Sequence, residues 1–214
     1  MDRRLQVVGV CCGLSATVVF FASLAHAVAN DPTFTLFSSY LSDLGVGPEA
    51  DVFNTAIVTA GLLMLPFAVL GLWPELRGSL WSIPATAALC LAGAFTVLAG
   101  IYTEDSIEVH SDVSMGVFLS MAATGVLAWL ALRAHHPLGR RVTELTQAVA
   151  ILGALLVPMA GHPFFETIMA MAAFIWLPII SVARLRQLLA KPVTSGVSAR
   201  PPATGPDIPI EITK

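Results

Sequence analysis

Positive and negative residues alternate along this chain in step with six apolar stretches. All eleven Lys and Arg residues lie before the first stretch, at every second junction, or after the last stretch. The remaining junctions contain acids and no base: Asp31, Asp43, Glu49, Asp51, Glu104, Asp105, Glu108, Asp112 and Glu166. A soluble protein has no reason to sort its charges in this way, whereas the cytoplasmic loops of membrane proteins carry an excess of Lys and Arg. The pattern therefore predicts a membrane protein with both termini in the cytoplasm.

The six stretches are long enough to cross a bilayer, which requires about 20 mostly apolar residues. The chain is 56% hydrophobic and 12% charged, whereas about 25% of the residues of soluble domains are charged. The predicted spans are 6–29, 51–73, 79–101, 112–133, 142–160 and 164–183. A soluble bundle of six buried helices would need polar faces with helical periodicity, and the stretches have none. We therefore expect an all-α integral membrane bundle of six transmembrane helices over residues 1–190, located in the cell membrane.

The two ends of the chain require separate interpretation. The start, Met1–Arg4 followed by an apolar run, is similar to a secretory signal, but the run exceeds the roughly 7–15 residues usual for one. We therefore expect the first helix to be retained. Residues 191–214 are rich in Pro, Gly, Ser and Thr without an apolar period, which predicts a disordered cytoplasmic tail. The basic residues are scattered singly at helix ends, so nucleic acid is not expected as a partner, and the sequence does not specify an oligomeric state.

The first acidic junction, residues 30–50, is unusually long and has an apolar face that is too short to span a membrane. This face predicts a short interfacial helix or a segment tucked over the mouth of the bundle. The apolar side chains are those of Phe34, Leu36, Phe37, Tyr40, Leu41 and Leu44.

Acidic residues and histidines are concentrated on one predicted face of the membrane. Helix N-termini stabilise acids by about 0.3–1 kcal/mol each, and three predicted helices begin on this face, so capping accounts for roughly half of these acids. Glu104, Glu108 and Asp112 are spaced four apart near Asp105 and His110, and like charges at this spacing destabilise a helix. Screening by solvent and salt, a protonated carboxyl group or a bound divalent cation would relieve this repulsion.

His26, His110 and His162 are predicted on the same face, together with Asp43 and Asn54. Carboxylates with imidazoles suit Zn²⁺ or Mn²⁺. We therefore expect a site for a divalent cation such as zinc, formed by Asp43, His110 and His162. The ligands would come from separate helices, so no short metal motif is present. The alternative is that these histidines cap helices or lie at the membrane interface.

Two short motifs flank the second and third apolar stretches. The first is Tyr40-Leu41-Ser42-Asp43-Leu44-Gly45, with Phe53-Asn54 after it; the second is Gly100-Ile101-Tyr102-Thr103-Glu104-Asp105, followed by His110. In these motifs the chain resembles a prokaryotic six-span membrane family known as domain of unknown function 998. The resemblance extends over most of the apolar region and brings no established reaction. The family usually has Pro where this chain has Thr103, which loosens the turn. The resemblance implies these candidate site residues: Ser42, Asp43, Gly45, Asn54, Glu104, Asp105 and His110.

Three functions are compatible with these features. The first is an acidic, histidine-containing pocket at the outer face that binds or hydrolyses a lipid or other amphiphile. If the protein is an enzyme, it would be a metal-dependent membrane hydrolase in which the cation activates a water molecule. Glu104 and Asp105 would then be catalytic, and Ser42, Asp43, Gly45 and Asn54 would bind the ligand. The second function is a small-solute or proton-coupled transporter, and the third is a non-catalytic structural or lipid-organising protein.

Overall fold

The computed structural model describes residues 1–133, 137–159 and 161–190 of the chain. These residues form helices joined by short connections, and no strand occurs among them. The predicted disordered tail, residues 191–214, lies outside the described residues.

Six helical segments are long and apolar enough to cross a membrane, which confirms the all-α, multi-pass prediction. The second continues from α2 through a π-helix and the short helix α3, and the fourth begins with the 3-10 turn η3. The elements are α1 (Arg3–Asn30), η1 (Leu41–Gly45), α2 (Ala50–Pro66), η2 (Phe67–Leu72), α3 (Trp73–Leu76), α4 (Ser82–Ile101), η3 (Glu104–Ser106), α5 (Ile107–Leu132), α6 (Arg140–Leu156), η4 (Val157–Met159) and α7 (Pro163–Ala190).

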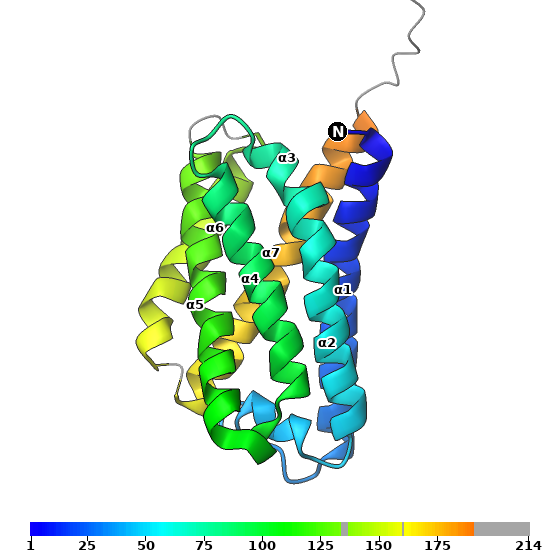
Figure 1. Ribbon diagram of the computed structural model, residues 1–214, viewed down its shortest axis with the longest axis vertical. Helices are drawn as coiled ribbons and strands as arrows, with labels where there is room; N and C mark the ends of the chain where they lie inside the picture. Colours follow the sequence, from blue (N-terminus) through cyan, green and yellow to red (C-terminus); the bar gives the residue numbers. More distant parts are fainter. Residues whose placement is uncertain (134–136, 160, 191–214) are drawn as a thin grey trace, which may run out of the picture.

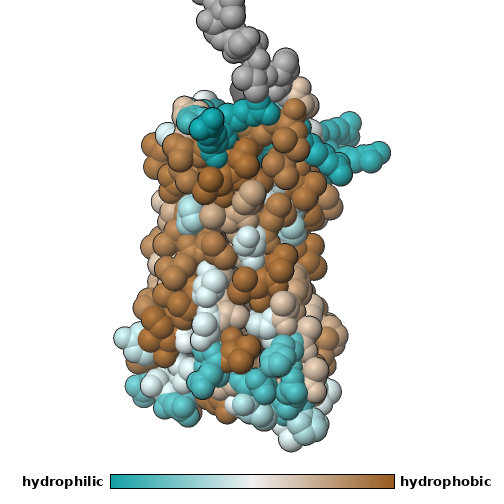
Figure 2. Space-filling view, turned by 90° about the vertical axis from the view of Figure 1, so that its right-hand side faces the viewer, coloured by the Kyte–Doolittle hydropathy of each residue, from teal (hydrophilic) through white to brown (hydrophobic). Residues whose placement is uncertain are grey.

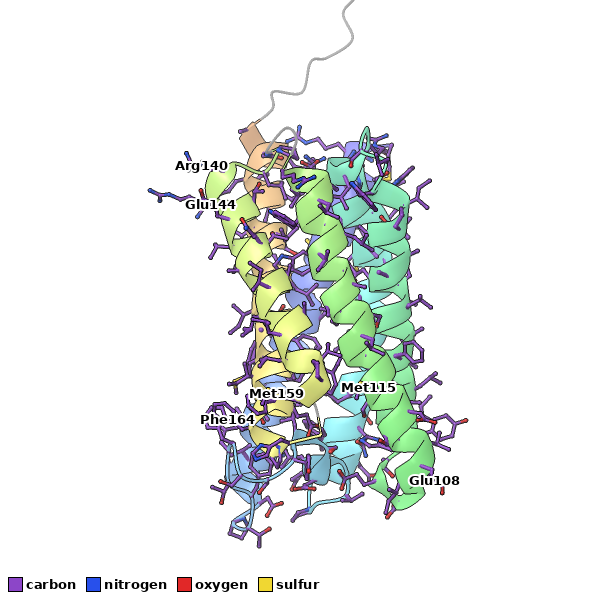
Figure 3. The ribbon with its side chains drawn as sticks, turned by 90° about the vertical axis from the view of Figure 1, so that its left-hand side faces the viewer. Glu108, Met115, Arg140, Glu144, Met159 and Phe164 are labelled. Atoms are coloured by element: carbon purple, nitrogen blue, oxygen red, sulfur yellow. The ribbon has the colours of Figure 1, made fainter. Side chains whose placement is uncertain are left out.

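The helices follow one another around the bundle in chain order. Each of α1, α2, α4 and α5 packs against the next of the six spans, and α7 closes the arrangement by packing against α1 and, less extensively, α6 (Figure 1). We call the end with the N-terminus, α3 and the last turns of α7 the basic end, because it holds every arginine of the described residues. The opposite end, with η1, η3 and the start of α7, is the acidic end. In Figure 3, Glu108 lies at the acidic end, and Arg140 and Glu144 lie at the basic end.

The surface between the two ends is apolar, as a lipid-facing surface must be. Figure 2 shows a broad hydrophobic band between hydrophilic ends on the face it presents. Large apolar side chains point outward along the helices, including Val18, which is 66% exposed, and Leu155, which is 67% exposed. The spans thus place the chain in a lipid bilayer.

Small residues allow the helices to approach closely inside the bundle, as is common in membranes. A Cβ atom on Gly61 of α2 would lie 2.7 Å from the carbonyl oxygen of Gly93 in α4. The contact between α1 and α7 includes stacked rings of Phe20 and Phe174, whose centroids are 3.9 Å apart. These contacts fix the helices that surround the cavity described below.

A buried charged network joins three elements at the basic end. The guanidinium group of Arg184 in α7 forms an ion pair with Glu75 of α3 and donates a hydrogen bond to Gln6 of α1. It also donates to Gln187 over 3.1 Å. The side chains of Arg184 and Glu75 are only 8% and 7% exposed. The network therefore ties the ends of α1, α3 and α7 together.

Candidate functional site

An apolar cavity extends from the acidic end to about the middle of the bundle. Its volume is about 130 Å³, and side chains from η1 and from every long helix line it. Its deeper walls are apolar and include Phe20, Met64, Met121, Phe174 and Leu177. Most polar side chains of the lining lie close to the acidic end, namely Ser42, Asn54, Thr103, His110, Ser114 and Glu166, whereas Thr96 lies deeper in α4. The cavity therefore has an apolar interior and a polar mouth.

The 3-10 helix η1 forms one side of this mouth. Its residues Leu41 and Leu44 are 6% and 1% exposed, so they anchor the segment to the bundle in the way that the apolar face of the junction predicts. The amide of Asn54 in α2 donates a hydrogen bond of 2.7 Å to the carbonyl oxygen of Gly45. A Cβ atom at Gly45 would lie 2.8 Å from Oδ1 of the same Asn54, so glycine permits this close approach.

Ser42 connects carboxylates from two other segments. Its hydroxyl donates to Oε1 of Glu104 in η3 over 2.5 Å. Its backbone amide donates to Oε1 of Glu166 in α7 over 3.3 Å. Glu166 is 9% exposed and lies within electrostatic range of both Glu104 and Asp43. Three carboxylates from three different elements are thus grouped around Ser42.

Asp43 experiences both partial burial and a neighbouring negative charge. Partial burial first, and the charge of Glu104 second, raise the pKa of the Asp43 carboxyl above its usual value. A hydrogen bond of 2.9 Å from the backbone amide of Tyr40 to Oδ2 of Asp43 acts in the opposite direction. The Tyr40 hydroxyl in turn donates to the carbonyl oxygen of Gly161 over 2.8 Å, which holds this side of the mouth against the α6–α7 connection.

Both ring nitrogens of His110 are occupied by hydrogen bonds within the protein. Nδ1 lies 2.5 Å from the carbonyl oxygen of Tyr102, and Nε2 lies 3.2 Å from the hydroxyl of Ser114. A carbonyl oxygen can only accept, so Nδ1 carries a proton and Nε2 is able to accept from Ser114. These two hydrogen bonds hold the His110 ring at the cavity wall.

The structure separates the predicted site residues into two groups. Ser42, Gly45, Asn54 and His110 line one cavity, and Asp43 and Glu104 interact at its mouth. Asp105 and His162 are exposed and do not line the cavity.

The ring of His162 is hydrogen-bonded to a neighbouring residue of the chain. Its Nδ1 accepts a hydrogen bond of 3.3 Å from the backbone amide of Phe164 at the start of α7. This contact corresponds to the capping role that was the alternative to metal binding.

The described residues contain no group of three or more His, Cys, Asp or Glu side chains that could hold one metal ion. The divalent-cation site of Asp43, His110 and His162 therefore stays a prediction, and no contact between these three side chains supports it. The grouping that does occur consists of carboxylates around a serine. Such a grouping attracts positive charge and hydrogen-bond donors.

No specific feature of the sequence places Glu166 in the site. An acid in the first turn of a helix is explained by the helix dipole alone, and Glu166 follows Pro163 at the start of α7. The available signal was that Glu166 lies one helical turn before the apolar positions Met169 and Ala170, which also line the cavity. Ser114 follows His110 by one turn in the same way.

Comparison with known proteins identifies one family. The model of the family described as "Protein of unknown function (DUF998)" matches residues 14–183 of the chain. No curated protein and no solved structure matches the chain significantly.

Proposed function

The chain belongs to the DUF998 family of proteins of unknown function, and we propose that this multi-pass membrane protein binds a lipid or other amphiphile at the acidic end of its bundle. The apolar part of the ligand would occupy the cavity, and its polar part would lie among Ser42, Asn54 and Glu166 at the mouth. We also propose that the acidic end faces outward from the cell membrane, since the arginines are at the opposite end.

The observation that carries the proposal is the division of the cavity into an apolar interior and a polar mouth. Ligand pockets are typically lined by apolar side chains with a few polar groups that fix the orientation. An engineered apolar cavity of about 150 Å³ stays dry and binds benzene, so the volume of about 130 Å³ here suits one slender apolar group.

The other functions have less support from the described residues. A transporter typically has ionisable residues near the middle of the membrane, but Glu166 and Arg184 lie near opposite ends of α7. Hydrolysis through a metal-bound water stays a prediction from the sequence. In that reaction Glu104, which accepts from Ser42, fits a role in the site better than the exposed Asp105 does.

The test fills the cavity and asks whether a bound amphiphile is lost. Ala173 lines the cavity, whereas Ala154 of α6 is exposed on the outer surface. We expect native mass spectrometry of wild-type protein, extracted with its surrounding lipid, to detect one retained amphiphile. Ala173→Phe should lose it and Ala154→Phe should keep it. Equal retention by both variants, or no retained molecule in the wild type, would contradict the proposal.

A further inference from the structure

The carboxylates at the cavity mouth have no cationic partner within the described parts of the chain. Neither Lys nor Arg forms an ion pair with Asp43, Glu104 or Glu166 there, and the described arginines are at the basic end. Of the three histidines at the acidic end, His26 lies 3.1 Å from Glu49. His110 and His162 make the hydrogen bonds described above. Among residues 1–133, 137–159 and 161–190, no cationic side chain therefore forms an ion pair with Asp43, Glu104 or Glu166.

Glu166 interacts with the backbone amides of Ser42 and Leu41, and Glu104 accepts from the hydroxyl of Ser42 and is hydrogen-bonded to Asp43. Neutral hydrogen bonds offset part of the cost of burying a carboxylate, but they do not remove the repulsion between like charges. A positively charged group at the mouth would remove it, and its N–H bonds could reach more than one carboxylate.

The geometry favours an organic cation over a metal ion. A metal needs several ligands at about 2 Å from one point, and the described carboxylates and imidazoles offer no such set. An alkylammonium has three N–H donors and forms charge-assisted hydrogen bonds at about 2.7–2.9 Å. It therefore fits carboxylates that are spread around Ser42, and an attached chain would continue into the apolar cavity.

We propose that the ligand of this cavity is an amphiphile with one slender apolar chain and a primary ammonium head group, which is bound by Glu166 with Glu104 and Asp43 close behind it. This inference rests on the proposed function, because it specifies the head group of the amphiphile that occupies the cavity.

The test compares two probes with the same chain, dodecylammonium and its uncharged counterpart N-dodecylacetamide. Tritiated probes are titrated into the full-length protein in nanodiscs of zwitterionic lipid, and binding to empty nanodiscs is subtracted. We expect dodecylammonium to bind about tenfold more tightly or better, the range typical of charge-assisted hydrogen bonds. The preference should fall in Glu166→Gln and Glu104→Gln, because glutamine keeps an oxygen that accepts from Ser42 but has no charge.

Glu108→Gln is the matched control, since Glu108 is an exposed acid of the same end outside the cavity. Retention of the preference in this variant, together with its loss in the other two, would support the inference. Equal saturable binding of both probes would overturn the ammonium head group and leave the proposed function standing. An equal loss in all three variants would show attraction to the acidic surface alone and would overturn the inference. If neither probe bound saturably and Ala173→Phe changed nothing, the proposed function would fail as well.

Discussion

Two aspartates of the same connection have opposite electrostatic environments. Asp31 accepts hydrogen bonds from the hydroxyl and the amide of Thr33, at 2.6 and 2.9 Å. The hydroxyl contributes most to lowering the pKa of Asp31. The Asp43 carboxyl is instead partly buried beside Glu104, and its pKa is raised. The charged form is therefore favoured at Asp31 and disfavoured at Asp43, although both lie between α1 and α2.

The substitution Asp43→Asn tests the environment of this carboxyl. Asp43 in the folded protein binds its proton more tightly than in the unfolded chain, so its contribution to stability declines as pH rises through the raised pKa. At about pH 7 the charged Asp43 repels Glu104, Glu166 and Asp31, so we expect Asn to raise the thermal unfolding midpoint. The difference should shrink as pH falls toward about 4, near the ordinary aspartate value.

The measurement is circular dichroism of the purified protein in detergent at several pH values. The exposed Asp51 provides the control, and Asp51→Asn should change the midpoint little at any pH. A lower midpoint for Asp43→Asn at neutral pH would mean that the carboxylate is stabilising. That result would favour the bound cation that the sequence predicts at this residue.

At the level of helices, the basic end depends on a buried ion pair and the acidic end on a short segment held by hydrogen bonds. Arg184 links α7 to α3 and α1, whereas η1 is held by Asn54, Glu104 and Glu166. The two ends should therefore respond differently to substitution. Loss of a contact at the acidic end loosens one segment, and loss of the ion pair leaves a charge inside the bundle.

Glu75→Gln should destabilise the bundle strongly, because it leaves the Arg184 charge buried without its counter-charge. Removing one partner of a buried pair costs about 3–5 kcal/mol. Glu144→Gln is the control, because Glu144 pairs with Arg140 over 2.7 Å with side chains 54% and 83% exposed (Figure 3). Such exposed pairs contribute about 0.3–0.5 kcal/mol. Reversible unfolding in mixed micelles measures both variants, and equal losses would contradict a structural role for the buried pair.

The six helices were predictable because each needs only a long apolar stretch, which is a local property of the sequence. Their ends were less predictable, since hydrophobicity marks the membrane-embedded part alone. The structure begins α5 at Ile107 and extends α7 to Ala190, beyond the predicted limits of 112 and 183. The pairing of Arg184 with Glu75 could not be predicted, because it joins distant residues that each appeared to belong to a polar end.

The candidate site was partly predictable because its two motifs, like the apolar stretches, are local features of the sequence. The motifs of η1 and η3 marked Ser42, Asn54, Glu104 and His110, which lie at the mouth of the cavity or in its lining. The sequence alone could not show that Glu166 rather than His162 faces this mouth, because residues four positions apart lie on the same face of a helix. The structure separates them because α7 begins at Pro163, so His162 precedes the helix and its ring accepts a hydrogen bond from the amide of Phe164.

The molecule as a whole is divided by charge. Every arginine of the described residues lies at the basic end, and the cavity opens toward the acidic end. If the basic end is cytoplasmic, the cavity receives its ligand from the outer leaflet or from outside the cell. If the orientation is reversed, the same cavity faces the cytoplasm, so the direction of insertion decides which amphiphiles can reach it.

Cysteine labelling in intact cells tests this orientation. Cys11, Cys12 and Cys90 lie within α1 and α4, and a background with alanine at these positions accepts single cysteines elsewhere. Ser38→Cys, in the connection between α1 and α2, and Ser111→Cys, an exposed position near the start of α5, should react with a membrane-impermeant maleimide. Ser79→Cys, at the basic end, should react only after lysis, because Lys and Arg favour the cytoplasmic side. Different reactivity of Ser38→Cys and Ser111→Cys would contradict the six-span topology, whereas the reverse pattern at all three positions would invert the protein in the membrane.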